Sequence, residues 1–187
     1  MTTQTDQSYV SVDDRRVRGK EAAKQTPLSS HAEGPQVAGR DAVGLLVEQN
    51  AMREPDLVPV RHGRMMVSPF TFYRGAARVM AVDLASTPTA GLQVQLCGDA
   101  HLSNFGGFAS PERQLLFGLN DFDETLPGPF EYDLKRMAAS FTIAARNNGF
   151  SKADANAVTA ESVKAYREAM AQFAGMRTLD VLSLIHI

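Results

Sequence analysis

The sequence predicts an α+β fold in which helices surround short β-hairpin strands. Three observations support this prediction. Apolar side chains recur at helical spacing in several segments, two short apolar runs have the length of strands, and turn-forming residues separate these segments. The chain has 187 residues, 44% of them hydrophobic and 21% charged, values that are typical of a soluble globular protein.

The first part of the chain is predicted to be helical after a polar start. Residues 1–40 carry mixed charge and show no apolar period, so we expect a disordered or loosely docked N-terminal arm. From Asp41 the segment DAVGLLVEQNAMR suits a short helix that ends before Pro55. The turn-rich stretch EPDLVPVRHGRMMVSPF follows. A second helix is expected over 70–85, since Pro69 just ahead of it is tolerated at a helix start.

Two strands and two helices are predicted for the rest of the chain. The segment STPTAG ends the preceding helix, and residues 92–97 (LQVQLC) then alternate as a strand with one buried face does. Residues 114–119 (QLLFGL) form a second run of strand length, after a glycine-containing loop with a turn at 110–113. Helices are expected over 131–146 and 151–174, and the first residue of the latter, a serine, is the expected N-cap.

Charge and cysteine content narrow the class of protein. The formal net charge of -2 and the sequence pI of about 6.1 argue against a dedicated nucleic-acid binder. No apolar stretch is long enough for a membrane span, and the N-terminus lacks the apolar run of a secretory signal. The single cysteine, Cys97, excludes an internal disulfide framework, which fits a reducing compartment. We therefore expect a cytoplasmic protein.

The last six residues, LSLIHI, have a separate interpretation. One set of codons for them, CTG TCT CTT ATA CAC ATC, resembles the transposon-end adapter used in sequencing-library preparation. We therefore expect residues 182–187 to be non-native sequence. On that interpretation the natural protein continues past Val181, and residues 41–181 are part of a domain.

Acidic and amide side chains gather in two short segments. LCGDAHLSNFG contributes Asp99, His101 and Asn104, and LNDFDE contributes Asp121 and Asp123. Because each segment adjoins a predicted strand, we expect these oxygens to lie at the ends of two neighbouring strands. Carboxylate and amide oxygens are the ligands that Mg²⁺ prefers, usually one or two carboxylates plus substrate phosphate oxygens.

The spacing of these residues indicates phosphoryl transfer. Asp99 and Asn104 are five positions apart, as in the catalytic loop where the Asp accepts the proton of the substrate hydroxyl and the Asn binds metal. Asp121 then stands where a metal-binding Asp opens the following loop. The sequence thus predicts Asp99 as the catalytic carboxylate and Asn104, Asp121 and Asp123 as metal ligands.

These motifs resemble the aminoglycoside phosphotransferase branch of the protein-kinase-like superfamily. The loop of that branch reads HGDxHxxN, and here CGDAHLSN has Cys97 in place of the first His. Its metal motif is an apolar residue followed by DF or DW, which NDFD matches in part. A downstream PxxxDL element is matched by Pro129, Asp133 and Leu134 in GPFEYDLKR. The resemblance implies a partial kinase-like catalytic lobe.

Longer blocks resemble one bacterial family, domain of unknown function 2252. They are SPFTFYRGAARVMAVDLA, VQLCGDAHLSNFGGFASPER and LNDFDETLPGPFEYDLKRMAAS, within about residues 53–179. The resemblance implies kinase-like chemistry with ATP and Mg²⁺. The 98 residues ahead of Asp99 contain no GxGxxG followed by a strand lysine, and in this family a glycine-rich segment and a lysine are expected after the catalytic loop. We therefore expect this chain to be an inactive fragment by itself.

Other residues near the motifs receive structural interpretations. His101 is expected to fix the loop by a hydrogen bond, and Asp133 to bond the loop backbone or cap its helix. Asp123 is either a second metal ligand or a structural acceptor. Cys97 is expected to be buried packing. Arg74, with Arg61 and Arg64, either binds a phosphate or carboxylate or pairs at the surface with Asp83.

Three functions remain open at this point. The first is phosphoryl transfer from a nucleoside triphosphate to an unidentified hydroxyl compound. The second is a metallophosphoesterase, because GDAH also occurs in that class, although two-metal sites need several His and Asp residues. The third is a non-catalytic pseudokinase or binding module that keeps the loop for structure.

Overall fold

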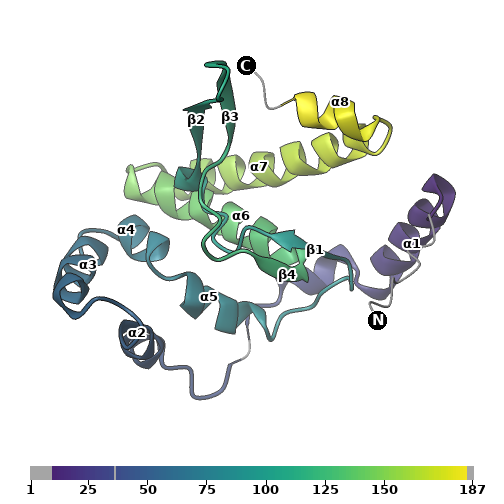
Figure 1. The fold of residues 1–187 in the computed structure, drawn as a ribbon. Helices are drawn as coiled ribbons and strands as arrows, with labels where there is room; N and C mark the ends of the chain where they lie inside the picture. Colours follow the sequence, from purple (N-terminus) through teal and green to yellow (C-terminus); the bar gives the residue numbers. More distant parts are fainter. Residues whose placement is uncertain (1–9, 36, 185–187) are drawn as a thin grey trace, which may run out of the picture.

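The computed structural model describes residues 10–35 and 37–184, which form a mixed α/β structure (Figure 1). Its helices are α1 (Val12–Gln25), α2 (Ala42–Asn50), α3 (Val58–Met65), α4 (Pro69–Arg74), α5 (Ala77–Leu84), α6 (Phe130–Asn147), α7 (Lys152–Phe173) and α8 (Thr178–Ser183). Its strands are β1 (Gln93–Leu96), β2 (Phe105–Ala109), β3 (Leu115–Leu119) and β4 (Leu126–Pro129). Short 3-10 turns occupy Leu28–Ala32 (η1), Pro55–Leu57 (η2) and Leu102–Asn104 (η3).

The long helices α6 and α7 pack against each other, and α6 also contacts α4, α5 and β1 (Figure 1). Gly149, with φ +82°, turns the chain between them, because glycine reaches the left-handed region without a steric penalty. The Thr142 and Thr159 hydroxyls are hydrogen-bonded across the interface at 2.5 Å. Ser151 caps α7 by accepting the Asp154 N–H, so both predicted helices and the predicted N-cap are confirmed.

Two separate antiparallel strand pairs replace the neighbouring strands that the sequence predicts. β1 pairs with β4, and β2 pairs with β3. The predicted strands at 92–97 and 114–119 therefore exist as β1 and β3 but do not pair with each other. Their true partners were not predicted, because β2 contains two glycines and β4 contains two prolines, which are residues typical of loops.

A helical corner built from α2 to α5 contains a small apolar core of Leu46, Met65, Ala76 and Val79. The helix predicted from Asp41 is confirmed as α2, which Asp41 caps by accepting the Gly44 N–H. The stretch predicted to be only turns contains α3. Its proline lies in the first turn, where no backbone N–H is needed.

The single helix predicted over 70–85 is divided into α4 and α5. The break falls at Gly75, where a Cβ would meet the Met65 side chain, so the glycine allows Met65 to pack against the backbone. Ser68 and Thr71 form a reciprocal capping box at the start of α4. This cap fixes the turn between α3 and α4, which brings the two helices to one side of the site described below.

The polar N-terminal segment forms a helix, α1, where the sequence predicts no regular element. Ser11 accepts the Asp14 N–H as its N-cap, and Ala22 is the only buried residue of α1. The N-cap, and not an apolar face packed on the core, therefore explains why a helix forms here. Residues 1–9, at the start of the predicted arm, lie outside the described part.

The expected adapter-derived tail also falls partly outside the structure. Its first two residues end α8, and residues 185–187 are not described. None of the described helices combines the length and the apolar character that crossing a membrane requires.

Candidate active site

One face of α6 holds the backbone of the loop that carries Asp99. Asp133 accepts the N–H groups of Cys97 and Gly98 at 2.7 and 3.0 Å, so the expected contact between Asp133 and the loop backbone is present. One and two turns along α6, Arg136 binds Asp99, and Ser140 accepts the Leu102 N–H at 3.0 Å. Since positions i, i+3 and i+7 share one face of a helix, α6 fixes the loop at successive points.

The start of this loop needs a glycine, Gly98, because of its backbone conformation and its close contact with another segment. Its φ of +83° is left-handed, and a Cβ at this position would overlap the Glu124 carbonyl oxygen. The glycine thus allows the loop to approach the segment that follows Asp121.

Arg136 is the buried partner of Asp99, and the sequence motifs did not identify it. Its side chain is 2% exposed, its Nε donates to Asp99 Oδ1, and its Nη2 donates to the Tyr73 carbonyl oxygen at 3.0 Å. The guanidinium lies 4.5 Å from the centre of the Tyr73 ring. Burial raises the pKa of Tyr73 to about 12, so its hydroxyl stays neutral and donates to the Arg136 carbonyl oxygen at 2.7 Å.

His101 is buried beside Asp99 but does not make the expected side-chain hydrogen bond. Its Nε2 lies 3.8 Å from Asp99 Oδ2, which is too long for a hydrogen bond, and its buried Nδ1 has no partner within the described residues. Its backbone N–H donates to the Asp99 carbonyl oxygen at 2.8 Å instead. Burial lowers the pKa of His101 more than the nearby Asp99 raises it, so the ring is held neutral.

The β2–β3 hairpin brings Asn104 and Asp121 together, although they are far apart in the sequence. Phe105 pairs with Leu119, and the Asn120 N–H donates to the Asn104 carbonyl oxygen at 2.8 Å, so the residues just outside this register are neighbours. Asn104 Nδ2 donates to the Asp99 carbonyl oxygen at 2.8 Å. Its Oδ1 accepts no hydrogen bond from the part of the chain that the structure describes.

Asp123 does not join this group. It is exposed and does not line the cavity that Asp99, Asn104 and Asp121 share, and its N–H donates to Asp121 Oδ1 at 3.2 Å. Across residues 10–35 and 37–184, no group of three or more His, Cys, Asp or Glu side chains is placed to hold a metal ion. Asp99 is paired with Arg136, so the oxygen donors left on this side of the cavity are the Asp121 carboxylate and the Asn104 amide oxygen. This set fits Mg²⁺, which keeps water or substrate phosphate oxygens in its remaining positions.

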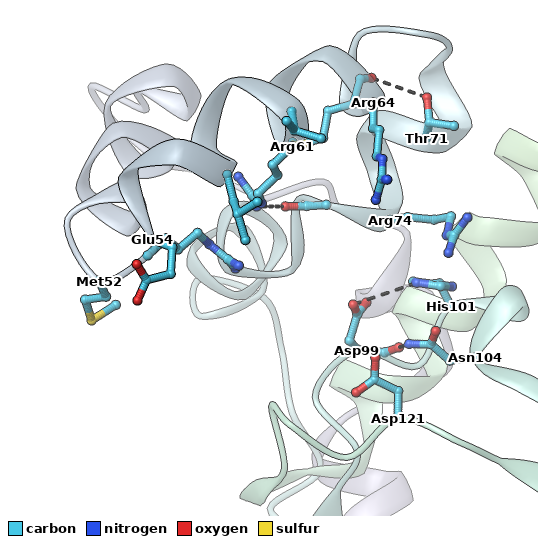
Figure 2. A pocket seen from close by; sticks show the side chains of 15 residues that line it. Met52, Glu54, Arg61, Arg64, Thr71, Arg74, Asp99, His101, Asn104 and Asp121 are labelled. Atoms are coloured by element: carbon cyan, nitrogen blue, oxygen red, sulfur yellow. Dashed lines mark hydrogen bonds and ion pairs between the residues drawn. The ribbon is translucent and has the colours of Figure 1, made fainter.

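A cavity of about 800 Å³ separates this loop from α3 and α4 (Figure 2). Asp99, His101, Asn104 and Asp121 line one side of it, and Figure 2 shows Arg64 and Arg74 across from them. Its size is within the range of small-molecule sites. The complete lining is Met52, Arg53, Glu54, Leu57, Val60, Arg61, Arg64, Met65, Thr71, Arg74, Gly75, Asp99, His101, Asn104 and Asp121.

Residues 53–186 match the family described as "Uncharacterized protein conserved in bacteria (DUF2252)". The chain belongs to this family. The match includes the loop, both cavity walls and α6, and it confirms the family resemblance seen in the sequence. No curated protein matches the chain, and no solved structure matches it.

The sequence of this DUF2252 chain contained a signal for Arg136 that motif spacing alone does not use. Asp133, Arg136 and Ser140 lie at helical spacing in a predicted helix, so they had to share a face. The sequence does not show that this face of α6 contacts the loop that carries Asp99. The surface pair suggested between Asp83 and Arg61, Arg64 or Arg74 is wrong, because Asp83 binds Arg40.

Cys97 of the DUF2252 chain is expected to be unreactive in the folded protein. It is buried, and burial, reinforced by Asp133, raises the pKa of its thiol to about 11. At pH 8 only roughly one thousandth of it is thiolate, the form that reacts with alkylating agents. Iodoacetamide labelling followed by mass spectrometry should therefore show protection at pH 8 and rapid modification after addition of urea. Rapid labelling without urea would contradict the buried assignment.

Proposed function

We propose that the loop from Asp99 to Asn104 is the catalytic loop of a Mg²⁺-dependent phosphotransferase that transfers phosphate from a nucleoside triphosphate to a hydroxyl compound. The observation that carries this proposal is that Asp99 and Asn104, on a loop held by α6, meet Asp121 at one cavity. The same residue types serve phosphoryl transfer at the same spacing in kinase-like catalytic loops.

Each side chain then has a distinct part in the reaction. Asp99 orients the acceptor hydroxyl and accepts its proton, while Arg136 holds the Asp99 carboxylate in place as a positioning residue. Asn104 Oδ1 and the Asp121 carboxylate would hold Mg²⁺. The bound ion would neutralise charge on the donor phosphates. The His101 ring is buried beside the Asp99 carboxylate.

None of the strands in the described part of the chain carries a lysine that could pair with the donor phosphates. Kinase-like enzymes use a strand lysine to pair the donor phosphates, whereas every lysine of this chain is on a helix. The lysines are Lys20 and Lys24 in α1, Lys135 in α6, and Lys152 and Lys164 in α7. We therefore propose that these residues form a partial kinase-like lobe of a cytoplasmic protein. Nucleotide binding would need a further segment, so the 187-residue chain by itself would be inactive.

A radiolabel transfer assay tests this function. The complete open reading frame of the gene would be expressed and incubated with γ-labelled ATP, Mg²⁺ and a bacterial metabolite extract, and the products separated by chromatography. We expect a Mg²⁺-dependent labelled product, and none from the 187-residue chain alone. Hydrolysis of a simple phosphate ester without nucleotide would favour a metallophosphoesterase. Absence of ATP binding by calorimetry would favour the pseudokinase alternative.

A further inference from the structure

The wall of the cavity opposite Asp99 concentrates positive charge that the protein does not neutralise. Arg53, Arg61, Arg64 and Arg74 all line the cavity, and none of them forms an ion pair with any described residue. By contrast, Arg40, Arg78, Arg136 and Arg177 each bind a carboxylate. We call these four cavity arginines the arginine wall.

Arg61 is the fixed member of the arginine wall. Its Nη2 donates to the Gly75 carbonyl oxygen at 2.6 Å and to Gln49 Oε1 at 3.1 Å, both neutral acceptors. Its Nη1 is buried and has no partner within residues 10–35 and 37–184. Burial and the positive charge of Arg53 lower the pKa of Arg61, and Glu124 raises it by less, so no nearby carboxylate compensates fully for burial of this guanidinium.

Arg64 and Arg74 are the exposed members, and they lie on two helices. Arg61 and Arg64 are three residues apart on α3 and so share a face, and Arg74 ends α4. The capping box of Ser68 and Thr71 fixes the turn between these helices. Arg64 and Arg74 are exposed, and Figure 2 shows them on the side of the cavity that faces His101 and Asp99. Removing them should therefore leave the core intact.

The net charge of the cavity favours an acceptor substrate with negative charge. Glu54 also lines the cavity, but it is exposed, and Figure 2 shows it beside Met52, away from the loop. Asp99 is engaged by Arg136, and Asp121 is assigned to the metal. The arginine wall therefore leaves a surplus of positive charge, which repels a polycationic acceptor such as an amino sugar.

We infer that the arginine wall binds the phosphate group of the acceptor, so that the substrate is a phosphomonoester with a free hydroxyl. This inference rests on the proposed function, because it uses Asp99 to fix where the hydroxyl lies. A phosphate ester carries about -1.5 to -2 charges at pH 7 and three acceptor oxygens, enough to engage more than one guanidinium fork, whereas a carboxylate suits one. The phosphate lies at the wall, and the hydroxyl reaches Asp99 across the cavity.

Binding of sn-glycerol 3-phosphate to the 187-residue chain, without nucleotide or metal, tests the inference. Isothermal titration at low ionic strength should show saturable binding that weakens with added salt, while glycerol, glycerate and spermidine bind at least about tenfold more weakly. The double variant R64Q/R74Q should bind the phosphate ester at least about tenfold more weakly. Arg146→Gln, which removes one exposed arginine at the end of α6, is the matched control and should bind as the unaltered chain does.

Several outcomes would overturn the inference. If glycerol and glycerol 3-phosphate bound equally, or if R64Q/R74Q bound the phosphate ester as tightly as the unaltered chain, the arginine wall would not be the phosphate-binding site. Glycerate binding as tightly as the phosphate would assign a carboxylate instead. Mg-ADP binding that R64Q/R74Q removes, with no binding of the phosphate ester, would assign the wall to the donor.

The proposed function fails by a different measurement. If glycerol 3-phosphate binds as expected but the complete protein transfers no phosphate, the arginine wall is still a phosphate-binding site, but the protein is not a phosphotransferase.

Discussion

Replacing Asp99 with Asn should lower phosphate transfer by the complete protein by about a thousandfold, within the range seen when a general base is removed. The amide keeps the size of the side chain but cannot accept the proton of the acceptor hydroxyl. The substitution also leaves the buried Arg136 guanidinium without its carboxylate, so the free energy of unfolding must be measured for this variant as well. Nucleotide binding by the folded variant should be largely retained, because Asn104 and Asp121, and not Asp99, are the proposed metal ligands. Transfer rate and nucleotide affinity would be measured on the same preparation.

Asp123→Asn is the matched control for this experiment. Asp123 belongs to the same acidic motif but is exposed and does not line the cavity. Its transfer rate should therefore stay within about twofold of the unaltered protein, as is usual for surface substitutions away from a site. Unchanged turnover in Asp99→Asn would remove Asp99 from the mechanism, and a large loss in Asp123→Asn would restore Asp123 as a metal ligand.

Replacing Arg136 with Met should destabilise the protein by about 3–5 kcal/mol, the usual cost of removing one partner of a buried ion pair. The Asp99 carboxylate would remain largely enclosed without its guanidinium, and the Tyr73 carbonyl oxygen would lose a donor. Methionine fills similar space, so the loss would come from the unpaired groups more than from a cavity. Urea unfolding of the 187-residue chain measures the free energy directly.

Arg40→Met provides the comparison for the buried pair. Arg40 binds Asp83 at the surface, where its side chain is 42% exposed, and exposed pairs contribute about 0–1 kcal/mol. If Arg136→Met cost no more than Arg40→Met, Arg136 would not be the anchor of the loop. The double variant D99N/R136M should be less destabilised than the sum of the two single variants, because neither partner then stays charged and unpaired.

Helices with strong local signals could be predicted from the sequence. α6 and α7 have apolar residues at helical spacing, and a serine cap starts α7, so neighbouring residues alone determine them. α3 was missed because its proline resembles a turn signal, and α1 because it has no apolar face. β2 and β4 were missed because glycine and proline disfavour strands, and only pairing with β3 and β1 fixes them there.

The candidate site was partly predictable for the same reason. Asp99, Asn104 and Asp121 can be predicted as site residues because two short motifs contain them at a characteristic spacing. The same motif also predicts Asp123, which is exposed and does not line the cavity. Arg136 was absent from the predicted site because its partner lies 37 positions away along the chain.

The sequence by itself determined the family, the long helices and the identity of the oxygen-bearing side chains, since each depends on residues that are close together in the chain. The tertiary structure decided which of these side chains share a cavity, which arginine anchors Asp99, and which arginines face it without a carboxylate partner. These relations depend on a hairpin register, the face of α6 and the turn between α3 and α4. They arise from contacts between distant segments, whose geometry no local pattern encodes.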